Sequence, residues 1–469
     1  MNTAGQTTLI TSIPRLFAAT VAMVAVGGCA SSGISPATTE LAAPGAWERG
    51  GDADQVGNNW LATFGSDSLT LLVDEAQRSN FRLAQERARL EQVQQSVIIT
   101  RADRFPSIDL SLDGSRRAVE GTDGIRVASN SFAAGLDAAW EMDVWGRLSK
   151  SQQAAQLSYS AQKARFEFAT RDLAARTAGA MFDALEARAL LELAEKRLDN
   201  ARQSRDIVAS GYRQGLNDAL DLYLANNQVE QEEAALAAQS QVVFESFAEL
   251  QLAMGRYPSG EMPLPGELPV ITDAIPVGLP SELLMRRPDI REAWLNLLSA
   301  DAGLAAAHKN RFPRITLVGS AGVTSVVFSD LLDGDGAGWS LIGGITQPIF
   351  QAGRLGALEE QAAARVREAE QIYLDVVFQA FAEVENAISR NVSLTDSYSS
   401  FVEAEKNAMS ALRLATEQYQ RGLVSYTTVL ESRRRAFDAS TTVIQLRNDL
   451  LQNRIALHLA LGGEFSTDY

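Results

Sequence analysis

The sequence predicts a mainly α-helical protein with membrane β-strands, built from two tandem repeats in one chain. Three observations predict this fold class: a long internal duplication, two stretches that alternate like β-hairpins, and helical stretches too long for a compact domain. Of the 469 residues, 46% are hydrophobic and only 7% aromatic. This composition favours extended helices over an aromatic-rich core.

Four short motifs occur twice at a constant separation. The pairs are Arg104-Phe105-Pro106 and Arg311-Phe312-Pro313, Gly146-Arg147-Leu148 and Gly353-Arg354-Leu355, Tyr212-x-x-Gly215-Leu216 and Tyr419-x-x-Gly422-Leu423, and Leu252-Ala253-x-Gly255 and Leu459-Ala460-x-Gly462. The separation is 207 residues in every pair, as in 311 − 104. A spacing that stays constant over so many residues indicates a duplicated structural unit.

The composition excludes several classes of function. The formal net charge is −16, and no run of Lys or Arg forms the basic patch that a nucleic-acid partner would require. One Cys and two His leave few parts for a metal site or for a Cys/His or Ser/His nucleophile. The chain also has no glycine-rich phosphate-binding loop. We therefore expect no enzyme activity, no cofactor and no metal site.

The N-terminal segment has the pattern of a lipoprotein signal. A soft apolar run from Leu16 to Gly28 is too short to span a bilayer but suits a signal peptide, which we assign to residues 1–28. It ends in Val26-Gly27-Gly28-Cys29, which resembles the site where a bacterial lipoprotein is cleaved and its cysteine acylated. The alternative is that Cys29 is a core cysteine. Because Ala30 follows instead of Asp, the pattern indicates the outer membrane of a Gram-negative cell, with residues 29–66 as a lipidated tether.

The first repeat, residues 67–255, begins with a predicted helix from Ser68 to Arg104. A predicted β-hairpin at 105–141 follows, in which Ile108, Leu110 and Leu112 alternate with polar residues and a polar loop spans about 114–130. Strands of about ten residues with one apolar face are what a membrane β-hairpin requires. A soluble β-hairpin is the alternative.

The rest of the repeat is helical and has a second copy. A long helix at 147–214 and a return helix at 217–254 are expected, and the second repeat (282–462) contains a helix, a hairpin at 312–350, and helices at 354–421 and 424–461. The long helix is about 100 Å and each shorter helix about 56 Å, so two short helices placed end to end match a long one. The Pro-rich connector 256–281 is expected to pack where the short helices meet, and 463–469 form a tail.

Strand counting predicts an oligomer. Two hairpins supply four strands, and an open four-stranded sheet cannot lie in lipid, where every backbone polar group needs a partner. The smallest membrane barrels have about eight strands. If these strands span a membrane, several chains must combine them, and three chains would give twelve.

The chain resembles the TolC-type outer-membrane efflux proteins, in particular the NodT-like lipoprotein branch that serves resistance-nodulation-division (RND) pumps. The most specific motif is Gly278-Leu279-Pro280-Ser281-Glu282-Leu283-Leu284-x-Arg286-Arg287-Pro288-Asp289-Ile290, although Trp294 departs from the family pattern. The resemblance implies a homotrimer with a 12-stranded β-barrel in the outer membrane, continued by a 12-helix α-helical barrel in the periplasm. It also implies an inner-membrane RND pump and a periplasmic adaptor protein as partners, with outer-membrane lipid held through acylated Cys29.

The resemblance places a periplasmic aperture and the adaptor contacts at the two glycine turns. The aperture positions are Asp218, Asp221, Thr428, Glu431 and Arg434. The adaptor contact positions are Tyr212, Gly215, Leu216, Tyr419, Gly422, Leu423 and Val424. A salt bridge of Glu431 with Arg434, within or between helices, is the expected lock of the closed state. The alternative is that these residues are ordinary solvated helix starts.

Three functions remain compatible with the sequence. The expected one is passive conduction of drugs and xenobiotics out of the cell. A channel for protein secretion or metal-ion efflux is the first alternative, and eight Met with two His do not favour metal transport. A non-conducting coiled-coil lipoprotein is the second alternative, although it would need neither four strands nor a strict duplication.

Overall fold

The computed structural model describes residues 44, 46–48, 60–120, 124–216, 218–270, 277–278, 280–331 and 337–463. These residues belong to one compact unit. The predicted signal peptide and Cys29, together with most of the predicted tether and tail, lie outside the described residues.

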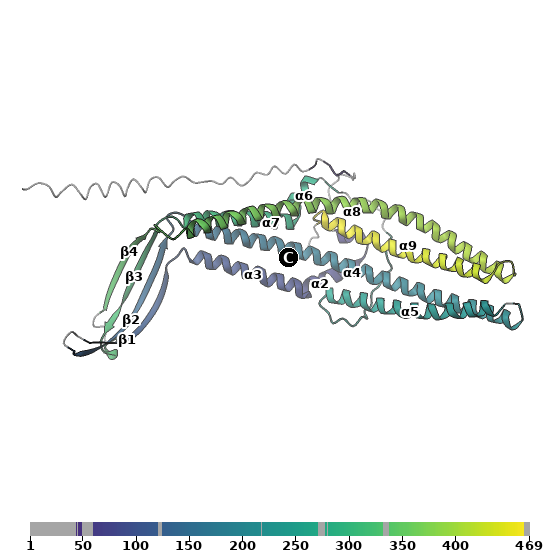
Figure 1. The fold of residues 1–469 in the computed structure, drawn as a ribbon, viewed down its shortest axis with the longest axis horizontal. Coiled ribbons are helices and arrows are strands. Elements are labelled where there is room, and N and C mark those ends of the chain that lie inside the picture. The colour runs from purple at the N-terminus through teal and green to yellow at the C-terminus, as the bar shows by residue number, and fades with distance from the viewer. Residues whose placement is uncertain are drawn as a thin grey trace, which may run out of the picture. The chain divides into compact units, whose positions relative to one another are not determined.

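The two repeats contain the same order of α-helices and β-strands and differ in the position of one short 3₁₀ helix each. The first comprises η1 (Trp60–Phe64), α2 (Asp67–Ser79), α3 (Phe81–Ala102), β1 (Ser107–Glu120), β2 (Arg126–Met142), α4 (Arg147–Arg213) and α5 (Ala219–Ala253). The second comprises α6 (Pro280–Arg286), α7 (Pro288–Lys309), β3 (Arg314–Ser325), η2 (Phe328–Leu331), β4 (Ala337–Thr346), α8 (Arg354–Gln420) and α9 (Tyr426–Ala460). In Figure 1 the strands lie at one end of the helices, and the α4–α5 and α8–α9 turns lie at the other.

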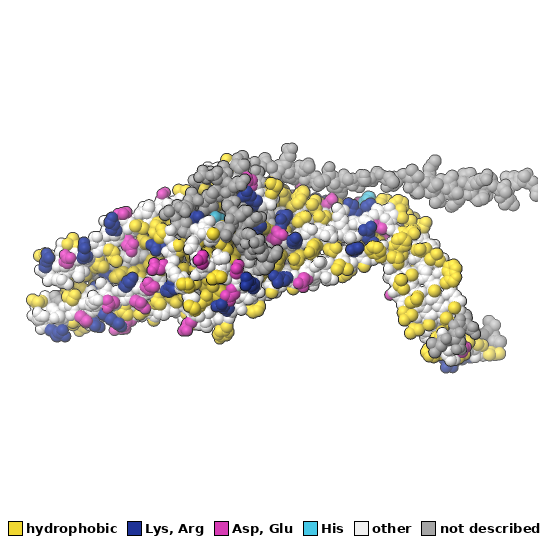
Figure 2. All heavy atoms as spheres, turned by 180° about the vertical axis from the view of Figure 1, so that it is seen from behind, with side chains coloured by type: hydrophobic (Ala, Val, Ile, Leu, Met, Phe, Trp, Pro, Cys, Tyr) yellow, Lys and Arg dark blue, Asp and Glu magenta, His cyan; other side chains and the backbone are white. Residues whose placement is uncertain are grey.

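The four strands form one antiparallel sheet in the order β1-β2-β3-β4. The register places Leu110 opposite Leu136, Leu136 opposite Ala321, and Ala321 opposite Trp339, so one face is apolar along the whole sheet. This face is open, with Leu110 72% exposed. Figure 2 shows mainly hydrophobic and uncharged side chains over the strands and mixed charges over the helices. A sheet with one exposed apolar face is the arrangement expected of strands in lipid.

The strands of the first hairpin are longer than the sequence predicted. The predicted loop at 114–130 is largely wrong, because β1 continues to Glu120 and β2 begins at Arg126. The register continues through polar pairs such as Arg116 with Asn130. Backbone hydrogen bonds extend the ladder whether or not the side chains are apolar, so the apolar pattern marks only part of each strand.

The helices form a layer that continues the order of the strands. Next to the sheet, α4 lies between α3 and α7, and α7 packs against α8. Toward the turns, α4 packs against α5 and α9, and α9 packs against α8. Helices α4 and α8 run through both parts, and their 67 residues each correspond to about 100 Å. Within the described residues, no helix combines the length and the apolar character needed to cross a membrane.

The predicted single helix from Ser68 to Arg104 is wrong, because Asn80 interrupts it. The Asn80 backbone is extended, and its Oδ1 atom accepts hydrogen bonds from the Arg82 and Leu83 amides at 2.8 and 3.0 Å. This is an N-cap, which starts α3 as a new helix. The Nδ2 atom of Asn80 donates to the Ala253 carbonyl at 2.8 Å. One side chain therefore caps the start of α3 and the end of α5.

Arg287 makes the corresponding junction in the second repeat, 207 residues after Asn80 (287 − 80). It occupies the N-cap position of α7, and its Nη1 atom donates to the Ala460 carbonyl at 3.0 Å. The guanidinium also pairs with Asp289 at 2.7 Å and Glu383 at 2.6 Å, and the residue is only 5% exposed. The most specific sequence motif thus joins α7, α8 and α9 at one point.

Glycine is required where the short helices meet. Gly255 has a φ of 69°, and a Cβ atom there would lie 2.3 Å from the Ser79 carbonyl oxygen. Gly462, its counterpart, has a φ of 68°, and its Cβ would lie 3.1 Å from the Arg286 backbone. The helix ends therefore approach as closely as backbones allow, which is the end-to-end arrangement that the helix lengths predicted.

We predict that Arg287→Met destabilises the protein far more than Arg286→Met. The first change leaves Asp289 and Glu383 without their cation, which costs about 3 kcal/mol, at the low end for a buried pair because Glu383 is half exposed. The second removes only the partly exposed pair with Glu282, worth at most about 1 kcal/mol. Thermal unfolding followed by circular dichroism checks this. Equal losses would show that the junction does not depend on Arg287.

Candidate functional site: the turns of the long helical hairpins

The two helix turns have the same backbone structure. At the first, Gly215 has a φ of 75°, and the Leu216 amide donates to the Gly211 carbonyl at 2.8 Å. At the second, Gly422 has a φ of 73°, and the Leu423 amide donates to the Gln418 carbonyl at 2.9 Å. Both are Schellman motifs, in which a left-handed glycine ends the helix. The duplicated glycines therefore set the sharp reversal of the chain.

The predicted adaptor-contact residues surround these reversals. Leu216 and Leu423 are well exposed at the two turns, and Tyr212 is also exposed. Val424 and Tyr419 are half-buried. The turns thus present apolar side chains to the surroundings, which is typical of a contact surface.

One contact joins the turns of the two repeats. The Tyr419 hydroxyl on α8 donates to Asp221 on α5 at 3.5 Å, a long hydrogen bond. Asp218 lies beside it as the N-cap of α5, accepting from the Asp221 amide at 3.1 Å. Asp218 therefore has the role of an ordinary helix start, whereas Asp221 connects two helical hairpins.

The charges around this contact shift both ionisable groups. Burial, followed by the neighbouring Asp218, raises the pKa of Asp221 above its ordinary value. Burial and the nearby Asp221 carboxylate raise the pKa of Tyr419 to about 12. Tyr419 is thus protonated at physiological pH and can act as the donor.

A buried cluster lies directly behind the Tyr419–Asp221 contact. Tyr426, 1% exposed, packs its ring 5.4 Å from that of Tyr419. Apolar residues of α4, α5, α8 and α9 surround it: Val208, Ala225, Leu412, Ala415, Val429 and Ala436. Tyr419 is therefore held in place by packing rather than by its long hydrogen bond.

Glu431 and Arg434 pair within α9. The Arg434 guanidinium donates to Glu431 at 2.9 and 3.1 Å, and Arg435 donates to the same carboxylate at 2.7 Å. These bonds, from Arg434 first and Arg435 second, lower the pKa of Glu431 to about 2. Arg434 also reaches Asp438 at 3.4 Å. Within the chain the pair is therefore intrahelical, and Thr428 lies exposed one turn earlier.

A groove of about 640 Å³ lies between α5 and α9 beside these residues. Glu232 of α5, almost fully buried, accepts from Arg197 of α4 at 3.2 Å and from Gln228 at 2.7 Å. Arg197 also lies over the Phe437 ring at 5.6 Å. Glu431 and Arg434, two predicted aperture residues of the second repeat, thus line a groove together with residues of α4 and α5 from the first repeat.

Sequence reasoning missed Arg433, which also lines this groove. It is 3% exposed and lies within a run of three arginines, Arg433 to Arg435, whose other members are exposed. Its position after the buried residues Tyr426 and Val429 follows the helical spacing of an apolar stripe. That spacing is the signal that could have identified it as buried.

The comparisons with known proteins agree with this architecture. The family model described as "Outer membrane efflux protein" matches residues 72–256 and 279–463, one match for each repeat. The chain belongs to the outer membrane efflux protein family. The family resemblance inferred from the sequence is confirmed, as are the two-repeat fold class, the outer-membrane location and the function as an efflux channel.

Individual relatives of this efflux protein cover nearly its whole length. The "Cation efflux system protein CusC" of Escherichia coli (strain K12) is 30% identical over 409 residues, which are 86% of this chain and 88% of CusC. The "Solvent efflux pump outer membrane protein SrpC" of Pseudomonas putida is 29% identical, covering 95% and 97% of the two chains. The solved structure of the outer-membrane channel OprN is similar with a TM-score of 0.82 and 25% identity, over 90% of this chain and 97% of that one.

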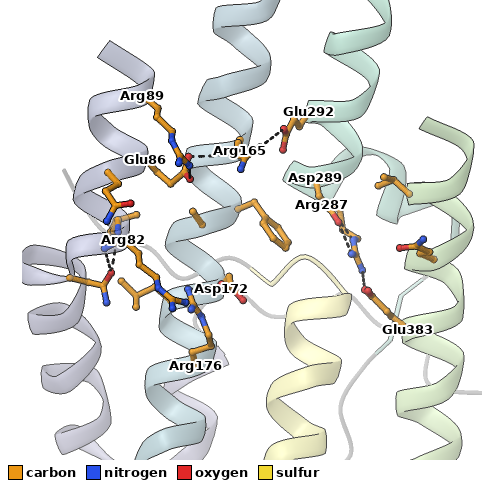
Figure 3. A pocket seen from close by; sticks show the side chains of 18 residues that line it. Arg82, Glu86, Arg89, Arg165, Asp172, Arg176, Arg287, Asp289, Glu292 and Glu383 are labelled. Atoms are coloured by element: carbon orange, nitrogen blue, oxygen red, sulfur yellow. Dashed lines mark hydrogen bonds and ion pairs between the residues drawn. The ribbon is translucent and has the colours of Figure 1, made fainter. Parts of the chain in front are cut away.

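A second hollow of this efflux protein lies nearer the sheet, between α3, α4, α7 and α8 (Figure 3). Its volume is about 530 Å³, and its charged side chains are largely paired. Arg165 lies between Glu86 at 3.4 Å and Glu292 at 3.8 Å, and Arg176 pairs with Asp172 at 2.8 Å. The hollow is therefore polar but nearly neutral in charge.

We predict that Tyr419→Phe raises single-channel conductance in planar bilayers, because the α8–α5 contact is lost while the ring packing remains. The acceptor is a carboxylate, but at 3.5 Å the hydrogen bond is long and contributes about 1 kcal/mol, so the change should be modest. In the wild type, the contact should persist below pH 10 and be lost as the pH rises through about 12, since Tyr419 must stay protonated.

The matched control is Tyr212→Phe, the equivalent residue of the first repeat, which is exposed. It should leave conductance unchanged. If both variants behave alike, the hydroxyl of Tyr419 has no special part in holding the turns together.

Proposed function

We propose that three copies of this chain form one closed channel. Strands β1 and β4 are the edges of the sheet, so each has a row of backbone groups with no strand partner among the described residues. In lipid every such group needs a hydrogen bond, and pairing β4 of one copy with β1 of the next supplies it. Three copies give a twelve-stranded barrel, and the helical layer, which has the same order, closes at the same time. The main support for this proposal is that the sheet has two unpaired edges, β1 and β4, and an exposed apolar face.

We propose that the tunnel is lined by the charged face of α4. Asp172 and Arg197 are separated by 25 residues, so at about 100° per residue they lie on the same side of the helix. Arg188 is 16 residues after Asp172 (188 − 172), so at about 100° per residue it lies about 160° away, on nearly the opposite side of the helix. Arg188 donates to the Leu264 carbonyl of the connector at 2.5 Å, so the connector covers the other side. A connector inside the tunnel would obstruct it, which supports the charged, ion-paired side as the lining.

We propose that the turns at Gly215 and Gly422 contact a periplasmic adaptor protein and that an inner-membrane RND pump supplies the substrates. The exposed Leu216 and Leu423 at paired, sharply folded turns support this contact. Cys29, which lies outside the described residues, is proposed to be acylated and to anchor the chain in the outer membrane.

We propose small, chemically varied molecules such as drugs and xenobiotics as the substrates. The hollow near the sheet, which Asp172 lines, is nearly neutral in charge, and such a wall selects weakly by charge, which suits a conduit that accepts what its pump delivers. Metal-ion efflux is the second candidate, because CusC is named for cation efflux. Among the residues described, no group of three or more His, Cys, Asp or Glu could hold a metal ion. Transport of dyes and of metal cations by cells that express the chain with its pump separates the two candidates.

Reconstitution of the purified protein in planar bilayers tests the channel itself. We expect a trimer by mass spectrometry and discrete conductance steps. A stable monomer, or a trimer without conductance, would support the non-conducting scaffold instead.

We predict that Glu431→Gln and Arg434→Gln each raise conductance, because either change breaks the ion pair that stiffens α9 at the proposed aperture. Since the pKa of Glu431 is about 2, the pair is complete above pH 4.5 and is lost as the pH falls toward 2. Conductance should therefore show no step from this pair between pH 5 and pH 8.

Lys406→Gln is the control for these variants, because it breaks a similar exposed pair, Lys406–Glu403 at 3.6 Å on α8. Its conductance should equal that of the wild type. If all three variants conduct like the wild type, the aperture is set by other residues.

A further inference from the structure

Arg433 is a buried cation with no carboxylate partner. Its Nη2 atom donates to the Ser204 hydroxyl of α4. Its Nε and Nη1 atoms are buried and have no carboxylate partner, and the Tyr426 hydroxyl lies within hydrogen-bonding reach of the guanidinium. The two groups are close enough that Arg433 counteracts the rise in the pKa of Tyr426 that burial causes.

The other charges around the groove are already paired. Glu232 is bound by Arg197, and Glu431 is bound by Arg434 and Arg435. Asp438 is bound by Arg434 at 3.4 Å. Each carboxylate that lines the groove therefore has a cation of its own, and Arg433 is left without one.

An arginine keeps its charge in a protein interior, so a buried guanidinium whose hydrogen-bond partners are all neutral is strongly destabilising. Such a group is normally matched by a carboxylate or another anion. Arg433 lines a groove whose walls, α5 and α9, belong to different repeats, although its Nε and Nη1 atoms are themselves buried. At the turns these walls are joined by the long Tyr419–Asp221 contact through α8 and by the buried cluster around Tyr426, which includes Ala225 of α5 and Val429 of α9. Access to Arg433 can therefore increase when the walls separate.

We propose that the groove between α5 and α9 is a binding site for a singly charged carboxylate, which Arg433 and the Tyr426 hydroxyl bind together. A guanidinium and a hydroxyl supply the donors that a carboxylate accepts. A doubly charged anion is disfavoured, because Glu232, Glu431 and Asp438 also line the groove. No described residue of the chain supplies this counter-charge.

The site has a consequence for conduction, and this step rests on the proposed function. The groove shares Arg197 with the proposed tunnel-lining side of α4, so a carboxylate-bearing molecule in the tunnel can reach it. Because the Nε and Nη1 atoms of Arg433 have no contact with solvent in this conformation, the ligand binds better when α5 and α9 are apart. A ligand that binds one conformation better shifts the population toward it. Carboxylate binding therefore favours the open turns.

Thermal unfolding of the purified full chain tests binding directly. Sodium acetate is titrated up to about 200 mM against sodium chloride at constant ionic strength. We expect the unfolding midpoint of the wild type to rise by about 1–2 °C. Arg433→Gln, which can still bond Ser204, should show no rise, and Arg433→Lys should show part of it. Arg390→Gln is the control and should respond like the wild type, because Arg390 is an exposed arginine of α8 that pairs with Asp449 at 3.4 Å and does not line the groove.

Conductance in planar bilayers gives the second readout. Acetate should increase the open fraction of wild-type channels but not of Arg433→Gln channels. No acetate effect on the wild-type midpoint, or an equal effect on Arg433→Gln, overturns the site. A midpoint shift in a protein that forms no pores would leave the site intact and contradict the proposed function instead.

Discussion

The unpaired backbone groups along β1 and β4 constrain everything else in this protein. A four-stranded sheet with one apolar face can remain in lipid only if both of its edges are bonded, and one chain cannot bond them. The helical layer has the same element order as the sheet, with α8 at one edge along its whole length and α3 and α5 at the other. In the proposed assembly, closing the sheet between copies would therefore also close the helical layer.

The duplicated motifs made most of this architecture predictable. The glycine turns, the long helices and the hairpins follow from apolar spacing and from glycines at equivalent positions. The helix break at Asn80 was not predictable in the same way, because a capping asparagine looks like any polar residue within a stripe of Arg, Gln and Glu. What gives it a role is the Ala253 carbonyl, which is 173 residues distant and comes close only through folding.

In the candidate site, too, contacts within one helix could be predicted from the sequence, whereas contacts between residues far apart in the sequence could not. The sequence placed Asp221, Glu431 and Arg434 at the turns, and the structure puts the last two into one intrahelical pair. The Tyr419–Asp221 contact spans 198 residues, so no local pattern could reveal it. The family resemblance directed attention to Arg434, but Arg433 is the member of the run that is buried. The helical spacing from Tyr426 and Val429 predicts that Arg433 is buried and Arg434 exposed, whereas the family pattern does not distinguish the two.

The junctions at Asn80 and Arg287 have a mechanical consequence. Below them, α5 and α9 each extend for 35 residues, or about 52 Å, without another break. A rotation of about 10° at such a joint displaces the far end by about 9 Å, as simple lever geometry on that length requires. A slight tilt at the side chains that cap these helix ends would therefore be amplified into a much larger displacement at the Gly215 and Gly422 turns.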